Sequence, residues 1–322
     1  MPFQWLRSVR VRDPALQETS YPVLSKDRTV LLHRILDLKD EDDVFLAEES
    51  LGDLIALPVT SEFLSSGIES DEAIELVGGY GVAFHLREPA DFWLLLTDKY
   101  STMKILEGFR LEHDSISWKT AKTSDGQFFE AVAEYFSLSL AGELFCESCE
   151  VRDSSYYIEE RIHRLESFLS PIIPKNISVL EVACGNGMAT QSLHRLGYGP
   201  FTMELDRCEM CQGLKAGKLE SNRSFVLDAR LLNRFLNPGS FDVVVGFMVG
   251  LIEQVNWNMW MEILLTASNL ASRMVLYTIY TRKEAELIAR SLDEAGWDVS
   301  IIDNRDASGI YDQWAVQADR KG

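Results

Sequence analysis

The sequence predicts an α/β protein in which a doubly wound, mostly parallel sheet of seven strands follows a smaller α+β unit. Two observations lead to this prediction. After residue 170, seven short runs rich in β-branched residues alternate with helical stretches, a pattern typical of a parallel sheet covered by helices on both faces. A glycine-rich turn follows the first of these runs, at the place where an open α/β sheet binds its ligand.

The length and composition indicate a globular chain with two domains. At 322 residues it is long enough for two hydrophobic cores, and its 46% hydrophobic and 25% charged residues argue against a disordered or fibrous protein. We expect the boundary near Val151 to Ser155. This gives an acidic α+β accessory domain over residues 1–153, which shapes or recruits the substrate, and a second domain over residues 154–322.

Neither a membrane span nor a signal peptide is predicted. The longest apolar runs, such as Val243 to Ile252, stop well short of the roughly 20 residues that a membrane-spanning helix needs. Residues 1–13 contain three arginines but no apolar stretch behind them. We therefore expect a cytoplasmic protein without a membrane partner.

The net charge of −19 is concentrated in the first half of the chain. Residues 1–150 hold 28 acidic and 13 basic side chains, giving −15, whereas residues 151–322 hold 22 and 18, giving −4. Binding to a phosphate backbone requires lysine and arginine, so we expect no nucleic-acid partner. The simplest interpretation of the acidity is solubility.

Several segments of the first half have clear periodicity. Residues 28–38 are helix-like, and apolar runs predict strands at Gly81–Leu86 and Phe92–Thr97, the first of them preceded by the turn signal Gly78-Gly79. A helix is predicted to begin near Ser124 or Asp125. Its apolar face is expected to be core: Phe128, Phe129, Val132, Ala133 and Phe136.

The second half begins with a helix and continues with the alternating pattern. Apolar residues recur at helical spacing up to Ser170-Pro171: Tyr157, Ile158, Ile162, Leu165 and Leu169. The seven predicted strands are Ser178–Val182, Phe201–Glu204, Ser224–Leu227, Phe241–Phe247, Met274–Tyr280, Val299–Ile302 and Trp314–Ala318.

The most informative segment is the run Val179–Gly187, with the sequence Val-Leu-Glu-Val-Ala-Cys-Gly-Asn-Gly. It predicts a buried strand, a glycine turn and then a helix over about residues 188–196. Gly185 and Gly187 allow a ligand to approach the backbone where any Cβ would clash, and they can adopt dihedral angles that other residues resist.

This segment resembles motif I of the class I S-adenosylmethionine-dependent methyltransferases, and the resemblance covers about half the chain. It implies strand order 3-2-1-4-5-7-6 and S-adenosylmethionine as the cofactor. Gly185 and Gly187 would then lie near the methionine portion of the cofactor, with Ala183 and Asn186 in the same turn. Glu181 would face the cofactor's amino group, directly or through water.

Two later acids occupy positions that the resemblance assigns to cofactor contacts. Glu204 ends the second strand, where a carboxylate accepts from both ribose hydroxyls, and Leu205 follows it. Asp228, followed by Ala229, would accept from the adenine amino group. Phe247 ends the fourth strand, where packing on the cofactor and packing in the core are equally good interpretations.

Other functions on the same fold remain open alternatives. A dinucleotide fingerprint needs a third glycine where Thr190 stands, which weighs against a dehydrogenase. Residues 246–249 read Gly-Phe-Met-Val rather than the Asn-Pro-Pro-aromatic sequence of enzymes that methylate DNA adenine or glutamine amides. A noncatalytic cofactor-binding or scaffold protein is the third reading. Small molecules, protein side chains and RNA remain open as acceptors, in that descending order, and the first two are favoured.

No catalytic residue is assigned from the sequence. Methyl transfer from a sulfonium requires alignment more than acid or base chemistry, so a catalytic base is not required. Side chains expected near the pocket are Glu253, His163 and the pair Tyr156-Tyr157.

The five cysteines do not form a disulfide framework, and we expect them to be reduced. Cys184 lies within the motif as a small apolar residue. The others form two pairs, Cys146 with Cys149 and Cys208 with Cys211. A shared zinc or iron-sulfur site is an alternative, but separate thiols without metal are the expectation.

Overall fold

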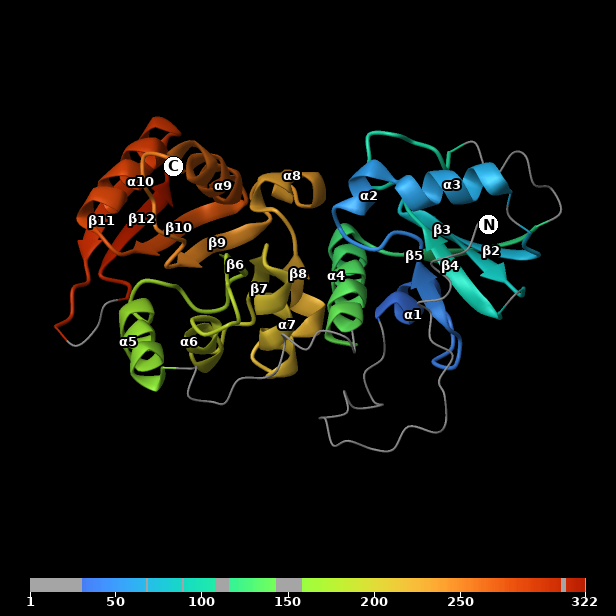
Figure 1. The fold of residues 1–322 in the computed structure, drawn as a ribbon, viewed down its shortest axis with the longest axis horizontal. Helices are drawn as coiled ribbons and strands as arrows, with labels where there is room; N and C mark the ends of the chain where they lie inside the picture. The colour runs from blue at the N-terminus through green and yellow to red at the C-terminus, as the bar shows by residue number, and fades with distance from the viewer. Residues whose placement is uncertain are drawn as a thin grey trace.

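The computed structural model describes residues 31–67, 69–88, 90–107, 116–142, 158–307 and 311–321. These residues form a five-stranded sheet and a seven-stranded sheet, and helix α4 (Asp125–Gly142) stands between the two (Figure 1). The predicted α/β class, with an α+β unit before the larger sheet, is confirmed. In the described part of the chain, no helix is both long and apolar enough to cross a membrane.

The first sheet has the order β1-β4-β3-β2-β5, with β1 parallel to β4, β2 parallel to β5 and the other pairs antiparallel. Its strands are β1 (Val44–Leu46), β2 (Glu72–Val77), β3 (Gly81–Leu86), β4 (Phe92–Leu96) and β5 (Ser117–Lys122). The helices of this half before α4 are α1 (Leu31–Leu36), α2 (Asp53–Ala56) and α3 (Pro58–Ser66). The predicted strand at 81–86 matches β3, and the strand predicted over 92–97 is one residue shorter.

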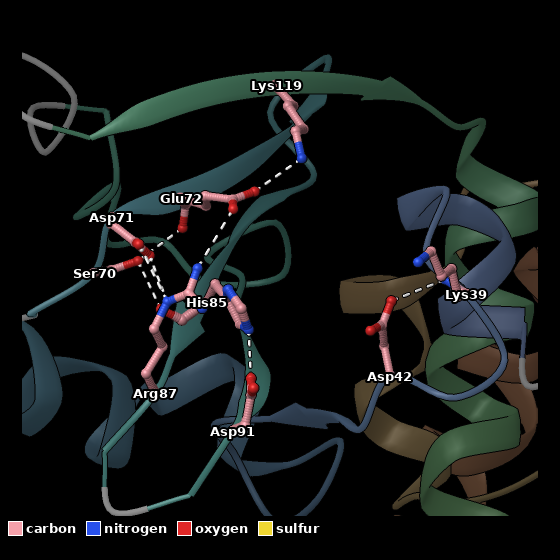
Figure 2. Close-up of polar contacts among 9 residues, drawn as sticks. All are labelled: Lys39, Asp42, Ser70, Asp71, Glu72, His85, Arg87, Asp91 and Lys119. Atoms are coloured by element: carbon pink, nitrogen blue, oxygen red, sulfur yellow. Dashed lines mark hydrogen bonds and ion pairs between the residues drawn. The ribbon is translucent and has the colours of Figure 1, made fainter.

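Charged side chains pair with one another on the exposed surface of this sheet (Figure 2). Arg87 Nε lies 3.1 Å from an oxygen of Asp71, and Lys119 Nζ lies 2.8 Å from Glu72. The Arg87 guanidinium lowers the pKa of the Asp71 carboxyl, and the Lys119 ammonium lowers that of Glu72. Because these groups are largely exposed, the pairs contribute little to stability.

The second sheet has the order β11-β12-β10-β9-β6-β7-β8, which is the predicted order 3-2-1-4-5-7-6 read from the opposite edge. Only β12 runs antiparallel to its neighbours. The strands are β6 (Val179–Val182), β7 (Phe201–Glu204), β8 (Ser224–Val226), β9 (Phe241–Phe247), β10 (Ala271–Ile279), β11 (Trp297–Asp303) and β12 (Trp314–Arg320).

Helices cover both faces of this sheet, since β9 is buried along nearly its whole length and its residues join two different cores. Val243, Val245 and Phe247 pack with side chains of α5 (Glu159–Leu169) and α6 (Thr190–Arg195). Val244 shares a core with α9 (Trp257–Asn269) and α10 (Arg282–Glu294) instead. The remaining helices are α7 (Arg207–Lys215), α8 (Leu232–Phe235) and the short turns η5 (Ser221–Arg223) and η6 (Ala229–Leu231).

Helix α4 packs against both sheets. Phe128 lies 5.3 Å from the Tyr80 ring of the first half, measured between ring centroids, whereas Phe129 lies 5.2 Å from Phe225 of β8. Phe128, Phe129, Val132 and Ala133 are buried, so the predicted core role of this face is confirmed, while Phe136 is partly buried. The domain division at 153/154 remains a prediction, and it assigns to the first domain a helix that covers the edge of the second sheet.

Candidate functional site

The turn after β6 has a left-handed backbone at three positions. Ala183 has φ 53°, Gly185 φ 56° and Gly187 φ 83°. The Gly187 amide donates to the Cys184 carbonyl oxygen at 3.1 Å, which closes the turn. A Cβ added at Gly187 would lie 2.7 Å from the Leu219 side chain, so only glycine fits there. Three of the site residues predicted from the sequence, Ala183, Gly185 and Gly187, therefore lie together in this turn.

Glu204 holds this turn from the neighbouring strand β7. Its Oε2 accepts from the Gly185 amide at 2.9 Å, and its Oε1 accepts from the amides of Leu205 at 2.8 Å and Asp206 at 3.0 Å. These three amides occupy three of the roughly four acceptor positions of the carboxylate, so one position remains open on Oε2, and accepting from a second ligand hydroxyl would displace a backbone amide. Leu205 beside it is 62% exposed, and Asn186 in the turn is buried.

Glu181, at the third position of β6, is the most unusual side chain of the site. It is 0% exposed, and neither of its carboxylate oxygens has a hydrogen-bond partner among the described residues. Burial raises its pKa to about 8. Arg161 and Thr190 offset part of this rise, but the Thr190 hydroxyl does not reach hydrogen-bond geometry within the described residues. A buried acid without a partner is costly unless something else pairs with it.

Arg161, whose charge lowers the pKa of Glu181, belongs to a buried ion pair. Arg161 Nε on α5 lies 2.7 Å from Oδ2 of Asp312, just before β12, and Arg161 Nη2 lies 3.2 Å from Oδ1. The hydroxyl of Thr278, near the end of β10, donates to Asp312 Oδ1 at 2.6 Å. Because Arg161 and Asp312 lie 151 residues apart in the chain, their pairing could not be seen in the sequence.

Asp228 follows β8 and is already paired. Its Oδ1 accepts from the Arg230 amide at 3.0 Å, and the Arg230 Nε lies 3.0 Å from both carboxylate oxygens. The guanidinium lowers the pKa of the Asp228 carboxyl. Ala229 is buried beneath this corner. The sequence predicted Asp228 at the end of the third strand, but β8 ends at Val226 and Asp228 begins the turn that follows. An adenine amino group would have to share its carboxylate with Arg230.

Phe247 lies in the core rather than at an open position. It is 5% exposed and packs with Leu165 and Leu169 of α5. The backbone then reverses through Met248, which has φ 55°. This burial agrees with core packing, and contact of Phe247 with a cofactor remains a prediction.

The candidates for acid or base chemistry do not converge on the turn. His163 lies on an exposed face of α5, 3.1 Å from Glu159 and 3.2 Å from Glu166. Glu253 is exposed in the segment between β9 and α9. Tyr156 and Tyr157 lie outside the described residues. A catalytic base is therefore not evident in the described part of the chain.

Three cysteines lie within the described residues. Cys184 and Cys211 are buried and Cys208 is exposed, and burial raises the pKa of the Cys184 thiol. Cys146 and Cys149 lie outside the described residues, so the shared metal site remains untested. Within the described ranges, no group of three or more His, Cys, Asp or Glu side chains is arranged to bind a metal ion.

Comparison with known proteins gives structural neighbours only. The chain matches no protein-family model and no curated protein. It is similar to magnesium protoporphyrin IX methyltransferase from Synechocystis PCC 6803 with bound SAH, at 11% identity and TM-score 0.38 over 50% of this chain and 83% of that one.

Two further neighbours are S-adenosylmethionine-dependent methyltransferases. The protein from Aquifex aeolicus is 14% identical, with TM-score 0.37 over 51% of this chain and 94% of that one. The protein from Archaeoglobus fulgidus is also 14% identical, with TM-score 0.37 over 52% of this chain and 100% of that one. The fold of the C-terminal half rests on its own strand order and connections, described above.

Proposed function

We propose that the C-terminal half is a methyltransferase that binds S-adenosylmethionine at the carboxyl edge of β6 and β7. The observation that carries this proposal is Glu181, a fully buried carboxylate without a partner among the described residues, directly before a glycine turn. A ligand with an ammonium group would satisfy both the charge and the hydrogen bonds of this acid. The α-amino group of the cofactor is such a group.

The surrounding residues fit the other parts of the cofactor. Gly185 leaves room beside the backbone for the methionine chain, since a Cβ there would meet only Glu209 Oε2, at 3.8 Å, whereas the corresponding space at Gly187 is filled by Leu219. Glu204 would accept from the ribose hydroxyls, and Asp228 from the adenine amino group. Arg161 lies within electrostatic range of Glu181, so an ammonium and a carboxylate on the same ligand would both find an opposite charge.

When bound, this cofactor supplies an electrophilic methyl group, whose carbon–sulfur bond breaks as an acceptor's lone pair forms the new bond and the acceptor loses a proton to solvent. The chain's own contribution is alignment and exclusion of water, since no general base is evident among the described residues. A small molecule is the favoured acceptor, ahead of a protein side chain.

The test is isothermal titration calorimetry with S-adenosylmethionine, S-adenosylhomocysteine and a nicotinamide dinucleotide. We expect both sulfur compounds to bind with micromolar dissociation constants, about −7 to −8 kcal/mol. If the dinucleotide binds and neither sulfur compound gives heat, the methyltransferase proposal is wrong and a dehydrogenase becomes the better interpretation. Binding of the cofactor without turnover of any acceptor would support a noncatalytic protein.

A second calorimetric series tests the ribose contact. Glu204→Ala should weaken the binding of S-adenosylhomocysteine by on the order of 2 kcal/mol, because the ribose hydroxyls and the Gly185 amide lose their acceptor. Glu72→Ala, a change of the same type on the exposed surface of the first sheet, is the matched control and should leave the affinity unchanged. Equal affinity for both variants would mean that Glu204 is not the ribose ligand.

A further inference from the structure

A cleft of about 500 Å³ lies in the first half of the molecule. The described residues that line it belong to β2, β3 and β5, to the turn between β2 and β3, and to the segment after β4. Its volume falls within the range of roughly 300 to 1,000 Å³ that is typical of small-molecule sites. The described lining contains no residue that we assign to the cofactor, so this cleft is a separate candidate site.

Part of the lining of the cleft is apolar. Val82 of β3, Leu106 and Trp118 of β5 line it and belong to one hydrophobic cluster. The Trp118 ring makes an edge-to-face contact with buried Phe84, with ring centroids 6.2 Å apart, so the indole is held in place. An indole offers contact to an apolar body and attracts a cation to its face.

The segment 98–107, which supplies another part of the lining, is fixed by hydrogen bonds. Asp98 Oδ2 accepts from the Leu106 amide at 3.1 Å, which closes the segment into a loop. The Tyr100 carbonyl oxygen accepts from Arg234 Nη2 of the second half at 3.1 Å, which anchors the same loop from outside. Because the loop is already ordered, a ligand would bind without an entropic cost for forming this part of the cleft.

Asp98 supplies the cleft with a buried carboxylate. The residue is 5% exposed, and its second oxygen, Oδ1, lies 4.0 Å from the Lys104 ammonium, which is beyond hydrogen-bond distance. Lys104 Nζ donates instead to the carbonyl oxygen of Asp98, at 2.8 Å. Oδ1 can therefore accept from an N–H donor that enters the cleft.

The charges around the cleft favour a cation over an anion. The described lining contains three acids and two lysines, a net charge of −1: Glu75, Asp98, Glu107, Lys99 and Lys104. The Lys99 ammonium lies 2.9 Å from Asp125, an acid outside this lining, so its charge is already compensated there. Residues 1–150 carry −15 in all, and a field of this sign attracts cations and repels phosphates and carboxylates.

We infer that this cleft binds a small organic cation, with an ammonium group that donates to Asp98 and an apolar body that packs against Trp118. The carboxylate supplies charge and direction, and the indole supplies contact area and a cation–π attraction. Val82 and Leu106 exclude water from the apolar body of the ligand. This site is independent of the proposed function of the second half.

Calorimetric titration of the full chain with three probes tests the inference. 2-Phenylethylamine, 2-phenylethanol and phenylacetate each carry one phenyl ring and differ in charge. We expect the amine to bind at least about tenfold more tightly than the acid, with the alcohol between them. S-adenosylhomocysteine is omitted, so the outcome does not depend on the cofactor. Acid binding as tight as that of the amine, or no amine binding at millimolar concentration, would overturn the inference.

Two variants locate the bound amine. Asp98→Asn keeps an oxygen for the Leu106 amide but removes the charge, so it should weaken amine binding at least about tenfold and abolish the preference for amine over alcohol. Trp118→Leu should weaken both amine and alcohol at least about threefold, because the ring contact is lost. Asp71→Asn, which changes an exposed acid outside the described lining, is the matched control and should alter nothing. Amine binding that survives Asp98→Asn unchanged lies elsewhere and rejects the site.

The alcohol reports whether the cleft of the Asp98 variant is still formed. If Asp98→Asn loses the alcohol as well as the amine, Glu75→Gln decides, because it removes a charge from the lining and leaves the hydrogen bonds of Asp98 in place. Glu75→Gln should weaken the amine severalfold and leave the alcohol unchanged. An unchanged preference for the amine in this variant would then contradict the inference.

Discussion

Each half of the molecule contains one buried glutamate in or just after a strand, and the two acids differ in their surroundings. Glu48, after β1, is 2% exposed and accepts from the amides of Thr60 at 2.9 Å and Val59 at 3.3 Å, at the start of α3. Glu181, in β6, is 0% exposed and has no hydrogen-bond partner among the described residues. Burial raises the pKa of both acids.

The difference separates a structural acid from a ligand-binding one. The amides at the N-terminus of α3 offset part of the cost of burying the Glu48 charge, although burial still outweighs them, and Glu48 in return supplies the acceptor that these amides need. Glu181 has no hydrogen bond of this kind among the described residues, and Thr190 and Arg161 offset only part of the cost of its burial, so it lowers stability when it ionises. A side chain that lowers stability at the edge of a sheet indicates selection for binding rather than for folding.

The comparison assumes that the two halves fold as one unit, and Phe129 tests this assumption. Phe129→Ala should lower the free energy of unfolding by about 3 to 5 kcal/mol, because a buried ring between α4 and β8 is lost. Urea unfolding followed by tryptophan fluorescence and by circular dichroism should show a single shifted transition. Two separate transitions would mean that α4 does not unite the sheets.

Glu181→Gln should separate binding from stability. The folded-state pKa of Glu181 is about 8, whereas the ordinary value is 4.5. Between these values the folded protein holds a proton that the unfolded chain has lost, so this group makes stability fall as pH rises from about 4.5 to 8. The glutamine variant should lack this decline and be more stable above pH 8 by a few kcal/mol.

The same variant should lose cofactor affinity by roughly tenfold to a hundredfold, since the ammonium loses a charged acceptor. Urea unfolding at several pH values and calorimetry with S-adenosylhomocysteine measure the two effects. If the variant binds normally and shows the wild-type pH profile, Glu181 has no part in the site. Glu75→Gln, on a strand of the other sheet, is a control for changes in net charge.

Glu48→Ala should lower stability and leave cofactor affinity unchanged, the opposite of the result expected for Glu181→Gln. The amides of Val59 and Thr60 lose their acceptor, so the free energy of unfolding should fall by about 1 to 3 kcal/mol. Affinity for S-adenosylhomocysteine should stay unchanged, because α3 belongs to the first half. Thermal unfolding with and without ligand measures both quantities, and a loss of affinity at constant stability would contradict the structural role of this acid.

Strand positions were predictable wherever apolar runs were bounded by turn residues. β3, β7 and β9 have the predicted bounds, since each is a buried run. The edge strand β5 was missed because its sequence, Ser-Trp-Lys-Thr-Ala-Lys, is mostly polar and exposed. β5 is a strand because it pairs with β2 of the same sheet, and its local sequence does not predict this pairing.

The candidate site was predictable only where its residues are neighbours in sequence. The motif placed Glu181 and the glycines of the turn together, but the ion pair of Arg161 with Asp312 depends on how α5 and β12 pack. The partner of Asp228 was also invisible, although Arg230 stands only two residues away. Side-chain direction at a strand end, rather than spacing, decides such pairs.

The smallest expected effect concerns this last pair and extends the comparison to an acid that is partly rather than fully buried. Arg230 and Asp228 form a largely solvent-exposed ion pair, with side-chain exposures of 43% and 22%, and such pairs contribute only about 0.2 to 1 kcal/mol. Arg230→Ala should therefore hardly change stability. The substitution should free the Asp228 carboxylate for the adenine amino group. The dissociation constant of S-adenosylhomocysteine should then fall by up to about fivefold, or about 1 kcal/mol. Arg282→Ala, which breaks an exposed pair with Glu286 on α10, is the matched control for calorimetry. Weaker binding by the Arg230 variant alone would show that the guanidinium orients Asp228 toward the ligand instead of competing with it.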